Sequence, residues 1–387
     1  AAEALALRTV WHAPATRHSA LRDDVPLAVR RAVAEVPGFL RLQPSLVLRL
    51  GPTMPRDRTI MFNVHLDTVA GMEPVGFDGT RFTGRGAIDA KGPAVALLAG
   101  LRAALAAEPA VGSEVGVLLQ AVAGEEGGAM GTIGTRPLVE RGFVGRLNVF
   151  CEPTDLRYLP RATASMTACV RVAGRDAIDD QPEVGHNATV LLGFLAQHLG
   201  ATLVPQVPDG RVCIAGMHTG RLHNRVYGSG ELLVNLSYAS VGSGAALETA
   251  VTQALCDGVV DFAARFASLR EFARTAVDAA RVTRLEWHKR GLPTLAGADE
   301  WCEALLREAG IARWPDAESA FTCDAIWMNG VPGAFTVVLG PGVLGTNNAH
   351  AQGEYAELAE LNAFATAVAR IVVCFARRRR TGAPEPA

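Results

Sequence analysis

The sequence lacks a pronounced charge of either sign. Its 37 lysines and arginines nearly balance 39 aspartates and glutamates, which gives a formal net charge of -2 over 387 residues. Such a chain has no strong field to steer it toward nucleic acid or an anionic membrane. The one basic run, Arg377 to Arg380, fits an RNA-binding or membrane-surface tail less well than a solvated helix end. We therefore expect neither nucleic acid nor membrane among the partners.

Cysteines at paired spacings are also missing. The seven cysteines are scattered, and no two of them form a CxxC arrangement. An odd, dispersed set argues against a disulfide framework and against a structural zinc site built from cysteine. The first residues show no basic head followed by an apolar stretch, and no run of about 18 apolar residues occurs. These absences predict a soluble, cytoplasmic protein.

What the sequence does contain is a series of apolar segments bounded by turn residues. Hydrophobic residues make up 49% of the chain, and the length suggests two or three domains. Residues 59–64, 115–123 and 146–151 have the composition of buried strands, and residues 90–105 have that of a helix. Apolar strands separated by helices predict an α/β domain with a central, mostly parallel sheet covered by helices.

The pattern changes near residue 163. Two strand–helix halves follow, with strands predicted at 167–172, 211–216 and 231–238 and helices at 182–199 and 245–274. A strand near 282–285, another at 337–339 and a helix from about 357 to 379 complete the chain. We therefore predict one domain built from residues 1–162 and 279–387, interrupted by an α+β insert at residues 163–278.

Polar residues directly follow three of the predicted strands. They are His65 with Asp67, the pair Glu125 and Glu126, and Glu152. Ligands bind beyond the carboxyl ends of strands in sheets of this kind, so these residues are the first sign of a site. Residues two apart in an extended segment point the same way, so Asp67 can support the imidazole of His65. An HxD pair alone is equally compatible with a structural role.

The remaining candidates also have ordinary explanations when they are taken singly. Asp89 lies where a loop becomes a helix and can serve as an N-cap. Glu125 and Glu126 fit a surface turn, although adjacent like charges raise a pKa unless a cation neutralises them. His350 follows a glycine–proline loop. Together, two imidazoles and several carboxylates form a ligand set that suits two Zn²⁺ ions, or Co²⁺ or Mn²⁺ in their place.

Seven segments occur in a specific order between about Asn63 and Glu354: HLDTV, GRGAIDAKG, EEGGAMG, EPT, PEVGHNA, LHNRV and GPGVLGTNNAH. In this order and spacing they resemble the zinc-dependent aminoacylase/carboxypeptidase family. That family includes acetylornithine deacetylase, succinyl-diaminopimelate desuccinylase and glutamate carboxypeptidase. The resemblance implies that the insert is a lid and dimerisation domain and that the protein is a homodimer.

The resemblance also implies a role for each candidate residue. One metal ion is held by His65 and Glu152, the other by Glu126 and His350, and Asp89 bridges the two. Glu125 is the general base, which takes a proton from a metal-activated water and passes it to the leaving amine. Asp67 is the partner that supports His65.

The insert departs from the family pattern. Ile178 occupies the position of a family histidine that helps to stabilise the oxyanion, and the loss of one such donor costs about 100- to 1000-fold in rate. Another donor replaces it, or the substrate needs less help, or the protein has left hydrolysis. The possible replacement donors are Arg175, His218, His223 and Asn224.

Two further features of the insert concern substrate binding. Asn224 matches a family asparagine, whereas Tyr227 stands where proline is usual. Arg221 and Arg225 are candidates for holding a substrate carboxylate.

The sequence as a whole predicts a two-metal hydrolase that cleaves an N-acyl amino acid or a short peptide-like amide. One alternative is a diverged enzyme with a specialised biosynthetic role, which Ile178 favours. Another is a metal-binding protein without turnover. Glu125 argues against the latter, because a pure metal-binding protein has no need of an unligated carboxylate.

Overall fold

The computed structural model describes residues 5–207 and 209–381. The chain divides into two compact units. The first is formed by Ala1–Ala162 with Leu295–Ala387, and the second by Thr163–Thr294. The insert therefore begins at the predicted residue, but it ends at 294 and not at 278.

The misplaced boundary has a simple cause. The strand predicted near 282–285 is β14 (Thr283–Lys289), and it pairs along its length with β9 (Ala164–Ala173) of the insert. Apolar composition identifies a strand but not the partner with which it pairs. The strand therefore belongs to the second unit, although we assigned it to the first.

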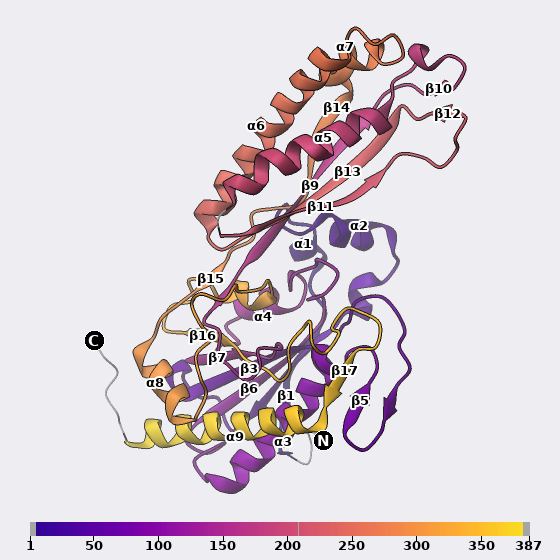
Figure 1. The fold of residues 1–387 in the computed structure, drawn as a ribbon. Coiled ribbons are helices and arrows are strands. Elements are labelled where there is room, and N and C mark those ends of the chain that lie inside the picture. Colours follow the sequence, from indigo (N-terminus) through magenta and orange to yellow (C-terminus); the bar gives the residue numbers. More distant parts are fainter. Residues whose placement is uncertain (1–4, 208, 382–387) are drawn as a thin grey trace. The chain divides into compact units, whose positions relative to one another are not determined.

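The first unit is built on a six-stranded sheet (Figure 1). Its strands lie in the order β1 (Arg8–Ala13), β2 (Ser45–Leu50), β6 (Gly116–Val122), β3 (Thr59–His65), β7 (Leu147–Phe150) and β16 (Phe335–Val338). The pairs β6–β3, β3–β7 and β7–β16 are parallel, and the pairs involving β2 are antiparallel. The α/β fold with a mostly parallel sheet is thus confirmed.

Helices α3 (Gly92–Ala107) and α9 (Leu358–Thr381) lie side by side against this sheet (Figure 1). Residues at alternate positions of β3, such as Phe62 and Val64, join α3 and α9 in one apolar core, together with α8 (Glu300–Glu308). The intervening residue Asn63 points the other way, because successive side chains of a strand alternate between faces. There it donates to Thr135 of α4 (Thr135–Glu140) at 3.0 Å.

The remaining described helices of the first unit, α1 (Arg17–Ala20) and α2 (Leu27–Glu35), pack on a small separate core. A three-stranded sheet joins β17 (Tyr355–Glu357), β5 (Arg81–Thr83) and β4 (Gly76–Phe77). Because β17 pairs with β5, this sheet brings the segment after His350 next to the segment before Asp89.

The second unit has a four-stranded antiparallel sheet in the order β11 (Arg211–His218), β13 (Ser229–Tyr238), β9 and β14. Helices α5 (Ala188–Leu203) and α6 (Val241–Phe266) lie over one face of this sheet, and α7 (Ala273–Val282) follows α6 (Figure 1). A two-stranded ribbon pairs β10 (Ala177–Ile178) with β12 (Arg225–Val226).

Among the residues that the structure describes, three helical segments are long and apolar enough to cross a membrane by length and composition alone. They are Ala87–Ala107, Ala188–Gln206 and Leu358–Thr381. None of them is an uninterrupted apolar run, because polar residues are interspersed in each. In the structure all three pack against the sheets, with residues such as Leu97, Leu195 and Val368 fully buried.

The basic run lies in the last turns of α9, where cations interact favourably with the helix dipole. Arg377 pairs with Glu108 at 2.9 Å, and Arg378 pairs with Glu308 at 2.8 Å. The guanidinium of Arg379 stacks on Trp301, 4.1 Å from the centroid of the ring. These contacts tie the run to its own unit, as expected of a helix end.

Candidate metal centre

The predicted ligands come from three neighbouring parallel strands and two loops. His65 is the last residue of β3, Glu125 and Glu126 follow β6, and Glu152 follows β7. Since β6, β3 and β7 are adjacent and parallel, their carboxyl ends meet at one edge of the sheet. The glycines that flank the glutamate pair adopt the left-handed backbone that favours glycine, with φ of 75° at Gly124 and 62° at Gly127.

Asp89 lies between the two histidines. One carboxylate oxygen, Oδ1, is 2.7 Å from His65 Nε2, and the other, Oδ2, is 2.8 Å from His350 Nε2. Asp89 is 4% exposed and lies in the turn Ala87–Lys91 before α3, so it does not act as a simple N-cap on the surface. A carboxylate that offers one oxygen to each of two imidazoles has the arrangement required of a bridging ligand.

Two glutamates extend this cluster, one at each histidine. Glu152 Oε1 is 3.5 Å from His65 Nε2, and Glu126 Oε1 is 3.0 Å from His350 Nε2. The contact of Glu126 does not have hydrogen-bond geometry, and among the described residues this buried oxygen has no hydrogen-bond donor. A buried acceptor without a donor is costly unless a cation satisfies it. The donor set thus fits two divalent ions, with His65, Asp89 and Glu152 at one and Asp89, Glu126 and His350 at the other.

The electrostatics of the cluster reflect its concentration of charge. The carboxylates of Asp89 and then Glu126, which lie close to its Nε2, raise the pKa of His350 to about 10. Burial would lower the pKa of His65, but Glu152 and Asp89 outweigh it and hold this pKa well above its ordinary value. Burial raises the pKa of Glu152 despite the nearby His65. Carboxylates gathered this closely repel one another, and bound cations would relieve that repulsion.

Glu125 lies next to the proposed metal ligands, in an environment different from theirs. It belongs to one group with His65 and Glu126. Desolvation, and after it the charges of Asp324 and Glu126, raise the pKa of Glu125 well above its ordinary value, although His65 opposes the shift. A carboxyl group with a raised pKa next to a metal site suits proton transfer.

Asp67 contacts the cluster otherwise than we predicted. His65 Nδ1 is 2.9 Å from the backbone oxygen of Asp67 and 3.8 Å from its carboxylate. The carboxylate instead accepts backbone N–H groups of Glu125 at 3.4 Å and Glu126 at 3.0 Å. Asp67 therefore supports His65 through its main chain, while its side chain holds the turn that carries both glutamates.

Glu354 anchors the backbone around Asp89, a function that the sequence did not reveal. Its Oε1 accepts the N–H groups of Ile88 at 3.1 Å and Asp89 at 3.2 Å, and its Oε2 accepts Arg85 at 2.7 Å. Glu354 is 1% exposed. Arg85 lies in the GRGAIDAKG segment, and Glu354 is the last residue of the region that resembles the family. The sequence does not show that the two residues are in contact. That contact follows from the pairing of β17 with β5.

A second buried acid lies behind Glu125. Asp324 is 1% exposed, and burial raises its pKa to about 6. The hydroxyl of Thr135 donates to Asp324 Oδ2, and Thr135 in turn accepts from Asn63 at 3.0 Å. The sequence did not indicate this role, because no local pattern places Asp324 near the glutamate turn.

The predicted substrate residues lie in the second unit, on its surface. Arg221, Asn224 and Arg225 are exposed, and Arg225 forms an ion pair with Asp176. Arg225 therefore already has an anionic partner within the insert. The hydroxyl of Tyr227, at the position where proline is usual, accepts the N–H groups of Arg221 at 3.2 Å and Leu222 at 2.9 Å.

Ile178 lies on β10, opposite Arg225 of β12, and is 56% exposed. The proposed substitutes for the family histidine, Arg175, His218, His223 and Asn224, are likewise exposed. The buried histidine of this region is His186, which accepts the N–H of Arg175 at 2.8 Å and lies 2.9 Å from Asp278. His186 thus has a structural role within the insert.

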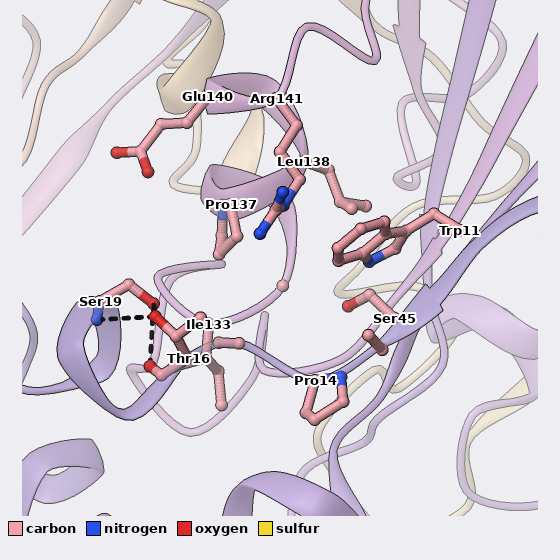
Figure 2. A pocket seen from close by; sticks show the side chains of 13 residues that line it. Trp11, Pro14, Thr16, Ser19, Ser45, Ile133, Pro137, Leu138, Glu140 and Arg141 are labelled. Atoms are coloured by element: carbon pink, nitrogen blue, oxygen red, sulfur yellow. Dashed lines mark hydrogen bonds between the residues drawn. The ribbon is translucent and has the colours of Figure 1, made fainter.

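A pocket of about 160 Å³ in the first unit lies apart from these residues (Figure 2). Its wall includes Trp11, Thr16, Ser19 and Arg141, and none of the candidate ligands. Arg141 stacks on Trp11 at 4.2 Å, and Thr16 accepts from the backbone of Ser19 at the start of α1 (Figure 2). These polar groups serve local structure, so we assign the pocket no catalytic role.

A curated protein is similar in sequence to part of this chain. A putative [LysW]-lysine/[LysW]-ornithine hydrolase of Aeropyrum pernix is 30% identical over 183 residues, and the match covers 46% of this chain and 47% of that relative. The chain thus matches about half the length of this curated relative.

Two solved structures share the fold. The M20 family metallo-carboxypeptidase Sso-CP2 of Sulfolobus solfataricus has a TM-score of 0.63 and 11% identity, covering 86% of this chain and 88% of its own. A dinuclear metal-binding peptidase of the M20 family from Bacillus subtilis has a TM-score of 0.53 and 13% identity, covering 92% and 95%. Residues 61–373 match peptidase family M20/M25/M40. The family predicted from the sequence is confirmed: the chain belongs to peptidase family M20/M25/M40.

Proposed function

We propose that this protein is a two-metal amidohydrolase, with zinc as the metal, that cleaves an N-acyl amino acid or a short peptide-like amide. The observation that carries the proposal is the position of Asp89, with one oxygen 2.7 Å from His65 and the other 2.8 Å from His350. An ion pair network built only for stability has no need of a single acid between two histidines. Imidazole and carboxylate are ligands that zinc accepts.

The residues around the site divide the chemistry. The bound ions would polarise the scissile carbonyl and lower the pKa of the attacking water. Glu125 takes the proton of that water and delivers it to the leaving amine, a task that suits its raised pKa. Asp67 holds the main chain of Glu125 and Glu126, so that one glutamate stays available for protons while the other serves as a ligand.

Metal content tests the site itself. The full-length protein, loaded with zinc and freed of excess metal, should hold two more equivalents than its Asp89→Ala variant, because both ions share this ligand. Inductively coupled plasma mass spectrometry measures the difference. Equal metal content in the two proteins would contradict the two-metal proposal.

Turnover tests the reaction. We expect the zinc-loaded protein to release free amine from at least one member of a panel of N-acyl amino acids and dipeptides. The name of the Aeropyrum relative adds amides of lysine and ornithine to this panel. If wild type and Glu125→Ala are equally silent on every substrate although both bind metal, the protein is a metal-binding protein without turnover.

A specialised biosynthetic role is the second candidate function, and Ile178 favours it. If the missing histidine is the only defect, Ile178→His should raise ordinary deacylase activity, by up to about 100- to 1000-fold. No gain would indicate that substrate handling in the insert has been rebuilt for an unusual amide. Dimerisation through the insert is part of the same proposal, and light scattering of the purified protein tests it.

A further inference from the structure

A second group of metal-ligand residues lies in the insert, on the sheet face opposite its helices. Cys169 is fully buried in β9, as are Ala168 and Val170, and α5 contacts this strand. Cys169 and Arg171 alternate with them and therefore point to the other face. That face is polar: the neighbouring strand β13 places Glu231 opposite Arg171, and β14 places Glu286 opposite Cys169.

An irregularity in β14 adds a histidine to this group. The register between β14 and β9 shifts between Trp287 and Lys289, so His288 is an extra residue without a partner position on β9. Such bulges re-aim a side chain relative to the regular alternation. As a result, ligand atoms of Cys169, Glu286 and His288 all lie within 4.8 Å of one another.

The surrounding charges suit a cation. Arg171 Nε lies 3.1 Å from Glu286 Oε1, and Arg171 Nη2 lies 3.3 Å from Glu231 Oε2. The Cys169 thiol lies 3.9 Å from the same oxygen of Glu231. The Arg171 guanidinium thus lies against two carboxylates, which leaves one negative charge in excess, and a Cys169 thiolate would add another. Arg171 also orients Glu286, as an outer partner of a metal ligand does.

We propose that Cys169, Glu286 and His288 form a zinc site in the insert, separate from the centre that contains Asp89. Thiolate, imidazole and carboxylate together are a ligand set typical of zinc, and three protein ligands leave the fourth position to water. The ligands come from two strands, β9 and β14, that are more than a hundred residues apart in sequence. A bound ion would therefore link the first and last strands of the insert and stabilise this unit.

Cobalt substitution tests the site by a signal that the other centre does not produce. Co²⁺ bound to a thiolate gives a sulfur-to-metal charge-transfer absorption, which nitrogen and oxygen ligands do not give. We expect this absorption in full-length protein loaded with Co²⁺, and we expect it to persist in Asp89→Ala. It should disappear in Cys169→Ser, which should also bind one equivalent of zinc fewer than wild type.

The controls separate this site from other thiols. Cys213→Ser removes an exposed thiol from β11 of the same sheet, and Cys151→Ser removes the thiol next to Glu152. Both variants should keep the absorption. His288→Ala, at a half-buried position, should weaken Co²⁺ binding at least tenfold without unfolding the protein, as judged by circular dichroism. Absence of the absorption in wild type, or its persistence in Cys169→Ser, would overturn the proposal, whatever the outcome for Asp89→Ala.

Discussion

In the first unit, ligand candidates from five separate segments meet in one cluster, in which His65, Asp89 and Glu152 are buried and His350 is half exposed, whereas in the second unit all the predicted substrate residues are exposed. The cluster is held from several sides, since Asp67 fixes the glutamate turn and Glu354 fixes the backbone of Asp89. The loop that carries Arg221 and Asn224 is held by the hydroxyl of Tyr227 and by the ion pair of Arg225.

This contrast reflects the different requirements of a metal site and of a substrate-binding surface. A metal centre needs its ligands within a few tenths of an ångström of fixed positions, which requires rigid strand ends and buried anchors. Residues that adapt to different substrates tolerate exposure and local anchoring. Departures from the family pattern are accordingly concentrated in the insert, at Ile178 and Tyr227.

The largest effect is expected from Glu125→Gln in the cluster of the first unit. This substitution removes the proposed proton acceptor but none of the proposed metal ligands. We expect kcat to fall by about 100- to 10,000-fold, because proton transfer by a positioned group contributes this much. Metal content should remain that of wild type. Glu114→Gln, at an exposed position in the same unit, should behave as wild type. Loss of metal together with activity would instead show that Glu125 is itself a ligand.

A smaller effect is expected when an anchor of the cluster is weakened. Glu354→Gln keeps the shape of the side chain but loses the charge that receives Arg85 and two backbone N–H groups. Outer partners of metal ligands are worth about 10- to 100-fold in metal affinity, and we expect a loss of that size in zinc titrations by calorimetry. Glu357→Gln, on the exposed Arg81 pair of β17, is the control. Equal affinity in the two variants would contradict the positioning role of Glu354.

A substitution in the loop that carries Arg221 and Asn224 should have a still smaller effect. Tyr227→Phe removes the acceptor of two backbone N–H groups, each bond being worth about 0.5–1.5 kcal/mol. If Asn224 binds substrate, KM should rise by up to about tenfold and kcat should change less. Tyr238→Phe deletes a hydroxyl elsewhere in the same unit, where it donates to Leu292 at 2.7 Å, and should leave KM unchanged. A fall in kcat alone would count against a binding role for this loop.

The smallest effect concerns the stability of the insert. Arg281, and then His186, hold the pKa of Asp278 well below its ordinary value. A depressed carboxylate pKa stabilises the fold above the unfolded-state value of about 3.9, and this contribution is lost as the pH falls toward the folded-state value. Asp278→Asn should therefore lower stability at pH 7 by at most about 1 kcal/mol.

Urea denaturation at pH 7 and pH 3 checks this sign. The difference in unfolding free energy between wild type and Asp278→Asn should be smaller at pH 3 than at pH 7. The exposed control Asp180→Asn should differ little from wild type at either pH. If the difference in unfolding free energy between wild type and Asp278→Asn is instead larger at pH 3, the ion pair of Asp278 with His186 does not stabilise the insert.

Much of the first unit could be predicted from the sequence because its signals are local. The strands that end at His65 and before Glu152 are mostly apolar, and the polar residues at or directly after their ends mark the edge of the sheet. Asp324 and Glu354 could not be placed in this way, because neither directly follows a predicted strand: Asp324 begins the short 3-10 helix Asp324–Met328, and Glu354 precedes β17. Their partners, Thr135 and the backbone of Asp89, are 189 and 265 residues away in sequence.

The sequence alone determined which residue types are available and in what order, since composition, apolar periodicity and motif spacing are properties of the chain itself. It thereby specified the α/β class, the insert and the set of acids and histidines. Only the tertiary structure decided which oxygen of Asp89 faces which histidine, that Asp67 supports His65 through its main chain, and that β14 belongs to the insert. Those outcomes depend on pairing between distant segments, and no local pattern encodes a pairing partner.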